Sequence, residues 1–406
     1  MGLDLFSVNG LNTLLHRTYQ EEQNMPKCIV PLPLGASGPR YLSGNEAAAE
    51  GALAAGCRFY AGYPITPSSE IMEALARDLP RVGGHFIQME DEIASISAVV
   101  GASWTGVKSM TATSGPGVSL MQECLGYAAF TETPLVVIDV QRAGPCTGQA
   151  TKVGAGDIMA VKWGSHGDYQ VLAFSPWSVE EMFTLTVEAF NWSERLRVPA
   201  FVLAEEATGH LRERVDLPEQ VDLYDRDYRP GEPPFGTEER DGVPSMPRFG
   251  QGENLMVTGS THDSRGFRKV EDPLVHDRLV RRLNEKVLSR TGRICRYESY
   301  YLANAELIVV AYGFTARAAL KAVKIARTQG LPAGLLRLVT IWPFDRALFA
   351  RHAGEGRRFL VPEMNLGQVA DLVRSAAGGR RVDSLTQVNG ETIEPAAVLA
   401  AIEEAF

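Results

Sequence analysis

The chain has 406 residues, of which 45% are hydrophobic and 22% charged, and its formal net charge at pH 7 is −9. This is the composition of an ordinary globular protein long enough for two or three domains. The acidic balance disfavours nucleic acid and anionic membranes as partners, and no apolar run approaches the roughly 18 residues that a membrane-spanning helix needs.

The first 40 residues predict an extended arm, with a short helix near residues 11–19. Polar residues interrupt the apolar ones there, so the arm does not have the form of a secretory signal peptide. The sequence has five scattered cysteines, none in a Cys-x-x-Cys pair: Cys28, Cys57, Cys124, Cys146 and Cys295. This spacing indicates free thiols in a reducing cytoplasm, with no disulfide framework and no metal or iron–sulfur site held by this chain alone.

Regular structure is predicted from Ser43, where a capping box with Glu46 precedes an alanine-rich helix that ends at Gly56. Strands and helices then alternate. The predicted strands are 58–63, 85–89, 107–113, 134–140, 169–175 and 199–204, and the predicted helices are 66–79, 92–105, 118–129 and 178–196. Such alternation is typical of a parallel sheet with helices on both faces.

A polar, proline-rich stretch interrupts this alternation between residues 209 and 300. It contains an amphipathic helix near Pro273–Leu288, whose arginines we expect on a solvated face: Arg278, Arg281 and Arg282. A second alternation follows, with predicted strands 306–312, 334–341 and 357–361 and helices near 315–328, 344–351, 367–376 and 395–404. We therefore expect an N-terminal arm (1–40), a larger α/β domain (41–235), a linker (236–300) and a smaller α/β domain (301–406).

Four consecutive predicted strands end in polar or glycine-rich loops, at residues 63–69, 88–92, 113–117 and 141–145. Ligands of such sheets bind beyond the carboxyl ends of the strands, so these loops should meet at one rim. The 113–117 loop opens a helix and suits an anion. It matches neither a P-loop nor a dinucleotide motif, however, and a simple tight turn explains it as well.

The sequence alone allows two interpretations for each of two charged residues in these loops. Glu92 begins a predicted helix, where the helix dipole alone favours a carboxylate. It could instead hydrogen-bond a cofactor ring nitrogen, a role for which Glu90 and Asp91 compete. Arg142 ends an apolar strand and is either a surface ion-pair partner or a bidentate ligand for a carboxylate.

These loops, in this order, resemble the pyrimidine-binding domain of thiamine diphosphate enzymes. The progression from Glu92 through a small-residue helix to Thr-Ser-Gly-Pro-Gly at 113–117 is shared broadly in that superfamily. Tyr-Pro-Ile-Thr-Pro-Ser-Ser at 63–69, Gln-Met-Glu-Asp-Glu at 88–92 and Asp-Val-Gln-Arg at 139–142 are similar to the alpha subunit of 2-oxoacid:ferredoxin oxidoreductases.

Within that family the 2-oxoglutarate type is the most similar. The similarity lies in Trp-Gly-Ser-His-Gly-Asp at 163–168 and in Val-Pro-Glu-Met-Asn-Leu-Gly-Gln at 361–368. The resemblance covers roughly residues 41–406. It implies an α/β chain with a pyrimidine-type thiamine domain, whose parallel sheet has helices on both faces, and a smaller C-terminal domain like that of transketolases.

The resemblance also implies roles for single residues. Glu92 should contact the N1′ nitrogen of the thiamine aminopyrimidine, Thr66 should lie beside the thiazolium and the substrate, and Arg142 should hold the 2-oxoacid carboxylate. The other residues expected to line the cofactor are Pro64, Ser114 and Gly115. The family oxidatively decarboxylates a 2-oxoacid, with coenzyme A as acyl acceptor and ferredoxin or another acceptor for the electrons.

The superfamily's diphosphate and Mg²⁺ motif, Gly-Asp-Gly followed by Asn, is absent: Gly156-Asp157 precedes Ile158, and Gly167-Asp168 precedes Tyr169. The resemblance therefore implies a beta subunit that carries the diphosphate half of the site, Mg²⁺ and [4Fe–4S] clusters. A gamma domain fused to the chain in some members is also missing, so a separate gamma subunit is expected.

Three alternatives remain. Ala143 and Cys146 stand where 2-oxoglutarate enzymes commonly have Gly and Ser, so a branched-chain or aryl 2-oxoacid is an alternative substrate. The chain could also be half of a non-oxidative thiamine decarboxylase or carboligase, or a subunit that only scaffolds an assembly. Thr66, Glu92 and Arg142 together argue against scaffolding, because a scaffold requires none of them.

Overall fold

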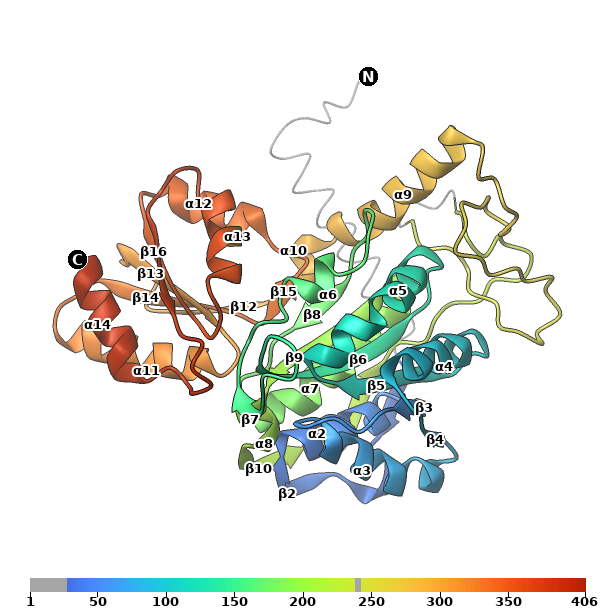
Figure 1. Cartoon of the computed structure of the whole chain (residues 1–406), viewed down its shortest axis with the longest axis horizontal. Helices are drawn as coiled ribbons and strands as arrows, with labels where there is room; N and C mark the ends of the chain where they lie inside the picture. Colours follow the sequence, from blue (N-terminus) through green and yellow to red (C-terminus); the bar gives the residue numbers. More distant parts are fainter. Residues whose placement is uncertain (1–27, 238–241) are drawn as a thin grey trace.

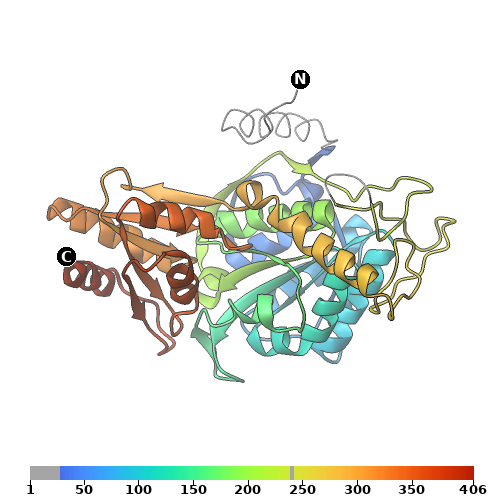
Figure 2. The same cartoon turned by 90° about the horizontal axis from the view of Figure 1, so that it is seen from above.

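A computed structural model describes residues 28–237 and 242–406. The helix predicted near residues 11–19 lies outside the described residues. Figure 1 shows a larger α/β unit, drawn from blue to green, beside a smaller one in orange and red. Seen from above in Figure 2, the smaller unit occupies one end of the molecule and the yellow connector loops occupy the other. Within the described part of the chain, no helix combines the length and apolar character needed to cross a membrane.

The larger unit is built on an eight-stranded sheet of order β15-β8-β9-β6-β5-β3-β4, with β7 paired to β6. Its strands are β3 (Cys57–Gly62), β4 (His85–Gln88), β5 (Lys108–Thr113), β6 (Leu135–Ala143), β7 (Gln149–Val153), β8 (Leu172–Phe174), β9 (Pro199–Glu205) and β15 (Thr340–Trp342). All pairs among β3, β4, β5, β6, β8 and β9 are parallel. The predicted parallel sheet is thus confirmed.

Helices cover both faces of this sheet, because its central strand is apolar on both sides. On β6, Leu135 and Val137 face the core under α4 and α5, whereas Val136 and Ile138 face the core under α2, α3 and α7. The helices are α2 (Gly44–Ala54), α3 (Ser69–Asp78), α4 (Glu92–Trp104), α5 (Gly115–Phe130), α6 (Ala160–Trp163), α7 (Val179–Leu196) and α8 (Glu206–His210), with the short 3₁₀ helices η1 (Pro33–Gly35) and η2 (Pro80–Val82). The predicted capping box of α2 is present, with both reciprocal hydrogen bonds.

The smaller unit has a five-stranded sheet of order β12-β14-β13-β16-β17. Its strands are β12 (Tyr297–Tyr300), β13 (Leu307–Tyr312), β14 (Ala333–Leu338), β16 (Arg358–Glu363) and β17 (Val382–Thr386), and its helices are α11 (Thr315–Thr328), α12 (Arg346–Gly354), α13 (Gln368–Ala376) and α14 (Pro395–Ala405). Only β12 pairs antiparallel within this sheet. The predicted second α/β alternation is confirmed.

The predicted strand 334–341 is wrong as a single element. It divides into β14, in the smaller sheet, and β15, which pairs antiparallel with β8 at the edge of the larger sheet. Ser175 donates a backbone hydrogen bond to Val339 at 2.8 Å, and this bond holds the crossing point against the larger unit. The apolar run is continuous from one sheet to the other, so its periodicity does not indicate where the chain passes from the smaller sheet to the larger one.

Part of the predicted N-terminal arm is joined to the larger unit by two antiparallel ladders. Strand β1 (Cys28–Pro31) pairs with β11 (Gln220–Leu223), and β2 (Gly38–Ser43) pairs with β10 (Arg212–Leu217). These strands are short and largely exposed on one side, so their sequences lack the apolar signal of a core strand.

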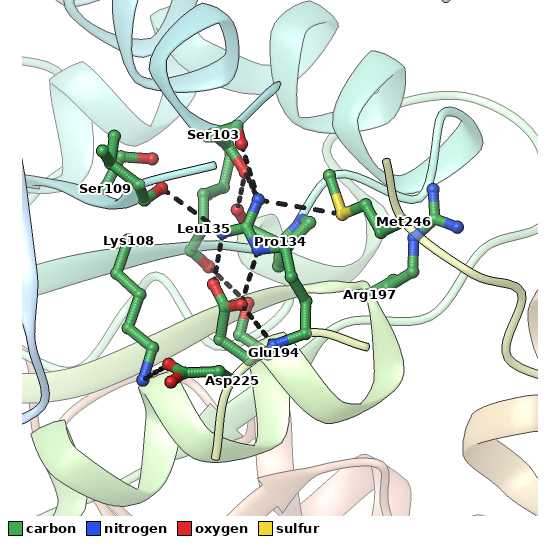
Figure 3. A network of polar contacts seen from close by, with 12 residues as sticks. Ser103, Lys108, Ser109, Pro134, Leu135, Glu194, Arg197, Asp225 and Met246 are labelled. Carbon is green, nitrogen blue, oxygen red and sulfur yellow. Dashed lines mark hydrogen bonds and ion pairs between the residues drawn. The ribbon is translucent and has the colours of Figure 1, made fainter. Parts of the chain in front are cut away.

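The connector between residues 224 and 272 has no helix or strand among its described residues and is held by polar contacts. Arg226 donates to both oxygens of Glu194, which is almost fully buried, and also to the Ser103 carbonyl at 2.6 Å. Lys108 pairs with Asp225 at 2.9 Å. Figure 3 shows Glu194, Ser103, Lys108 and Asp225 in this network. The connector is therefore tied to the ends of α4, β5 and α7.

Two helices follow the connector, the long α9 (Pro273–Leu288) and the short α10 (Thr291–Ile294). Helix α9 spans the residues that the sequence predicted, but the expected solvent-facing position of Arg282 is wrong. Its guanidinium binds both carboxyl oxygens of Glu132, at 2.6 and 2.8 Å, and Lys286 binds the same carboxylate at 2.8 Å. Glu132 lies directly after α5 and is completely buried. The ion pair therefore attaches α9 to the larger unit.

Candidate functional site

The four loops singled out in the sequence lie at one edge of the larger sheet. Strands β4, β3, β5 and β6 are parallel neighbours, so their carboxyl ends open on the same side. Arg142, at the end of β6, donates through Nη1 to the Thr66 carbonyl oxygen in the loop after β3, at 2.7 Å. Arg142 also lies within electrostatic reach of Glu92. The structure thus brings together Thr66, Glu92 and Arg142.

The loop that carries Thr66 is held by hydrogen bonds on its inner side, and its outer residues are exposed. Asn45 of α2 donates to the Pro67 carbonyl at 2.8 Å, and the Ser68 hydroxyl donates to the Ile65 carbonyl at 2.9 Å. Pro64 and Thr66 are themselves exposed. The two residues therefore face outward from the rim on a fixed base.

Three neighbouring acidic residues, which the sequence alone left in competition, have different surroundings. Asp91 caps α4, because its side chain accepts a hydrogen bond from the Ala94 N–H at 2.7 Å. Glu90 is exposed. Glu92 is 5% exposed, and burial, followed by the charge of Asp91, raises its pKa, whereas Arg142 lowers it. Of the three, Glu92 is the buried acid at the rim.

The glycine turn at the start of α5 is required by close packing. A Cβ atom on Gly117 would stand 1.9 Å from Thr113 Oγ1 and 2.7 Å from Glu92 Cγ. A Cβ atom on Gly115 would stand 2.9 Å from both carboxyl oxygens of Asp157. The turn therefore passes directly over two acidic side chains, which a larger residue would displace.

Several buried polar atoms at this rim have no hydrogen-bond partner within residues 28–237 and 242–406. They are Ser114 Oγ, Arg142 Nε, both carboxyl oxygens of Asp139 and Oδ2 of Asp157. Buried polar groups are nearly always paired, so a cluster of unpaired ones indicates a place built for a ligand or for catalysis.

Asp139 and Asp157 are site residues that the sequence analysis missed. Asp139 could have been noticed because it is a charged residue inside the apolar strand 135–140. Asp157 was noticed only as part of an incomplete diphosphate motif, and no local pattern indicated that it meets Asp139.

The cysteines and the potential metal ligands are dispersed. All five cysteines are free. Burial raises the pKa of the Cys57 and Cys295 thiols to about 12 in each case. No group of three or more His, Cys, Asp or Glu side chains in the described part of the chain is arranged to hold a metal ion.

Comparison with known proteins identifies the family. Residues 50–282 match the thiamine-diphosphate-binding domain of pyruvate flavodoxin/ferredoxin oxidoreductases, over more than half of the chain. Residues 305–398 match core domain II of pyruvate:ferredoxin oxidoreductase. The chain belongs to this oxidoreductase family.

Two relatives that are named as oxidoreductase subunits have a length similar to that of this chain. The 2-oxoglutarate synthase subunit KorA of Methanocaldococcus jannaschii is 48% identical over 359 residues, which cover 87% of this chain and 96% of the relative. The ketoisovalerate oxidoreductase subunit VorB of Methanothermobacter thermautotrophicus is 37% identical over 365 residues, which cover 89% and 97%. These matches confirm the predicted resemblance to the alpha subunit of 2-oxoacid:ferredoxin oxidoreductases.

A solved structure supports the architecture. The 2-oxoglutarate:ferredoxin oxidoreductase from Magnetococcus marinus, which has 2-oxoglutarate, coenzyme A and succinyl-CoA bound, superposes with a TM-score of 0.85 at 27% identity. The match covers 98% of this chain and 74% of that chain. The predicted fold class, a thiamine-binding α/β domain followed by a smaller α/β domain, is confirmed.

Proposed function

We propose that this chain is the alpha subunit of a 2-oxoglutarate:ferredoxin oxidoreductase. The complete enzyme would oxidatively decarboxylate 2-oxoglutarate, pass the acyl group to coenzyme A, and pass two electrons to ferredoxin or another acceptor. The grouping of Thr66, Glu92 and Arg142 at one rim carries the proposal. The substrate choice rests on relatives at 47–48% identity that are named 2-oxoglutarate synthase subunits, against 37% for a ketoisovalerate relative.

The rim fits the pyrimidine half of thiamine diphosphate. It offers a buried acid, Glu92, beside a glycine turn that leaves no space for a side chain, and a buried Ser114 hydroxyl without a partner in the described residues. Glu92 would hold the aminopyrimidine, and Pro64, Thr66, Ser114 and Gly115 would line it. When bound, the cofactor supplies a nucleophilic carbon and an electron sink, which no protein side chain provides.

Glu92 has the properties needed to hold a proton at a ring nitrogen. Its burial raises the pKa, so the carboxyl group exchanges a proton more readily near neutral pH than an exposed glutamate does. The glycine turn fixes its position, because Gly117 lies against its side chain. The role proposed for Glu92 is therefore to share a proton with the aminopyrimidine.

Arg142 is suited to binding the substrate carboxylate. Its side chain is largely buried and is oriented by the hydrogen bond to the Thr66 carbonyl, so little conformational entropy remains to be lost on binding. Its Nε has no acceptor among the described residues, and a guanidinium binds a carboxylate through two parallel N–H groups. A 2-oxoacid held there would lie beside Thr66.

The proposal includes partner chains. The relatives are named as subunits, so we infer a hetero-oligomer. A beta subunit would contribute the diphosphate-binding half, Mg²⁺ and [4Fe–4S] clusters, and a separate gamma subunit would complete the enzyme in the cytoplasm. Because the proposed cofactor site is divided between subunits, this chain alone should be inactive.

The test is to purify the chain with its native partners and to record the visible spectrum with coenzyme A and a panel of 2-oxoacids. Bleaching of the iron–sulfur absorbance by 2-oxoglutarate in preference to branched-chain and aryl 2-oxoacids is the expected result. Bleaching only by one of the other oxoacids would change the substrate. A colourless complex that still releases CO₂ would favour a non-oxidative thiamine enzyme.

A further inference from the structure

Asp139, which is buried, and Asp157, which is half-buried, form an acidic pair at the candidate site. Asp139 is completely buried on β6, three residues before Arg142. Asp157 lies beneath Gly115 in the loop after β7, and its carboxyl group is the direct neighbour of that of Asp139. No N–H or hydroxyl group of the described residues donates to either oxygen of Asp139 or to Oδ2 of Asp157. The neighbouring carboxyl groups can therefore pair with each other only if they share a proton.

A hydrogen-bonded pair of carboxyl groups must hold one proton, because a carboxylate only accepts hydrogen bonds. Burial, followed by the charge of Asp157, raises the pKa of Asp139 well above its ordinary value. Burial also raises the pKa of Asp157, to about 6, but Arg142 opposes this rise. Asp139 is completely buried whereas Asp157 is partly exposed, so the proton resides mainly on Asp139 and the negative charge on Asp157, which is the aspartate within reach of Arg142.

The loop that carries Asp157 is fixed from outside. Every residue from 155 to 159 has a backbone group hydrogen-bonded to a residue beyond the loop. Gln368 of the smaller unit donates to the Gly156 carbonyl at 2.7 Å and accepts from the Met159 N–H at 3.0 Å, and Asn365 donates to the Ala155 carbonyl at 2.7 Å. The 361–368 motif thus sets the position of Asp157.

This arrangement is costly for the fold alone. Burying polar groups without donors costs free energy, and replacing buried charges by apolar residues is often neutral or stabilising. A loop held at every residue places Asp157 against Asp139, where the two acids repel each other unless they share a proton. Buried acids of this kind occur mainly where function requires them.

We propose that Asp157 is a positioning residue for Arg142 and that Asp139, by holding the shared proton, keeps the pair at a single negative charge. That charge balances the guanidinium, so Arg142 stays at Thr66 with its remaining N–H groups free for a 2-oxoacid carboxylate. Without it, Glu92, which lies within electrostatic reach, would attract Arg142. The inference rests on the proposed carboxylate-binding role of Arg142 and adds a device that orients it.

The two aspartates provide a matched test, because asparagine imitates a protonated aspartate in size and as a donor. KM and kcat for 2-oxoglutarate are measured in the complex reconstituted with its partner chains. Asp157→Asn should raise KM about tenfold, which corresponds to about 1.4 kcal/mol of binding, with a smaller change in kcat. Asp139→Asn, which keeps the single negative charge on Asp157, should raise KM distinctly less than Asp157→Asn does. Asp216→Asn, on an exposed face of β10, is the control for the substitution itself.

Equal damage from Asp139→Asn and Asp157→Asn would overturn the proposal, since both acids would then have to be ionised. A normal KM for Asp157→Asn, with a raised KM for Arg142→Ala, would overturn the positioning role and leave the proposed function intact. An unchanged KM for Arg142→Ala would withdraw the carboxylate role itself. If the Asp157→Asn complex does not assemble, infrared difference spectra of wild type against Asp139→Asn test whether Asp139 holds the proton. The carbonyl band of a protonated carboxyl group, present in wild type, must then disappear in the variant.

Discussion

Two buried acidic centres of the larger unit are compensated in opposite ways. Burial alone would raise the pKa of Glu132, but Arg282 and Lys286 outweigh burial and hold that pKa well below its ordinary value. Asp139 is also completely buried and Asp157 beside it is half-buried, yet no donor of the described residues reaches three of their four oxygens. The first centre attaches α9 to the domain, and the second lies under the candidate site.

The difference separates acids that stabilise the chain from acids that serve a ligand. A fully paired carboxylate has no remaining capacity for a substrate or a proton, so its removal should damage folding. An incompletely paired one retains that capacity, so its removal should damage turnover or binding. Substitutions at the two kinds of centre should therefore affect different measurements.

The largest effect is expected at the paired centre. Arg282→Ala removes the bidentate partner of Glu132 and should lower the free energy of unfolding by about 3 kcal/mol or more, because a buried carboxylate loses most of its compensation. Thermal or denaturant unfolding measures this. Arg281→Ala is the matched control, since Arg281 precedes it on α9 and is exposed. Equal stability of the two variants would contradict the assignment.

The next effect is expected at Glu92 and concerns turnover. Glu92→Gln keeps the size of the side chain but loses the acid, and should reduce kcat of the reconstituted complex at least about a hundredfold. Its melting temperature should stay close to that of wild type, because Glu92 has no cation partner comparable to Arg282. Glu90→Gln, two residues away and exposed, should leave turnover unchanged. Near-normal turnover of Glu92→Gln would remove its proposed role.

A smaller, pH-dependent effect is expected at Glu205, a buried acid between the two units. Its carboxyl group accepts from the Phe314 N–H at 3.2 and 3.3 Å, and burial raises its pKa to about 8. In the unfolded chain its pKa returns to about 4.5. The folded state therefore binds more protons between these values, so the stability contributed by neutral Glu205 is complete below pH 4.5 and is lost as the pH rises through 8.

The expected loss between pH 6.5 and 8 is roughly 2 kcal/mol. Unfolding of wild type and Glu205→Gln at both pH values measures it, because glutamine keeps the acceptor for Phe314 but does not ionise. Glu132 should behave oppositely, since its lowered pKa gives stability that is lost as the pH falls below 4.5. Identical pH slopes for wild type and Glu205→Gln would show that Glu205 ionises in the folded protein as it does in solvent.

Much of the fold could be predicted because local signals sufficed. Helices α9 and α11 occupy the predicted residues, since a proline or small residue starts them and apolar residues recur at helical spacing. The rim could be predicted because the strand ends carry recognisable loops. The strand β15 could not be predicted, because nothing in a continuous apolar run indicates which sheet it joins.

The missed parts of the site depend on contacts between distant residues. Asp157 is placed by Gln368, through hydrogen bonds that span 209 and 212 residues. Arg282 reaches Glu132 across 150 residues. A sequence pattern read in a local window contains neither partner. An arginine predicted to face solvent therefore proved to be half-buried in an ion pair, and an aspartate without an assigned role proved to lie in the site.

The path of the chain through its two sheets has a consequence for dividing the protein. After the connector it enters the smaller sheet for β12, β13 and β14, returns to the larger sheet for β15, and leaves again for β16 and β17. No single break in the backbone therefore yields two pieces that each hold a whole sheet. A protease that nicks the proline-rich connector should give fragments that copurify, and a gene shortened there would encode a piece whose β8 edge is left bare and prone to aggregate.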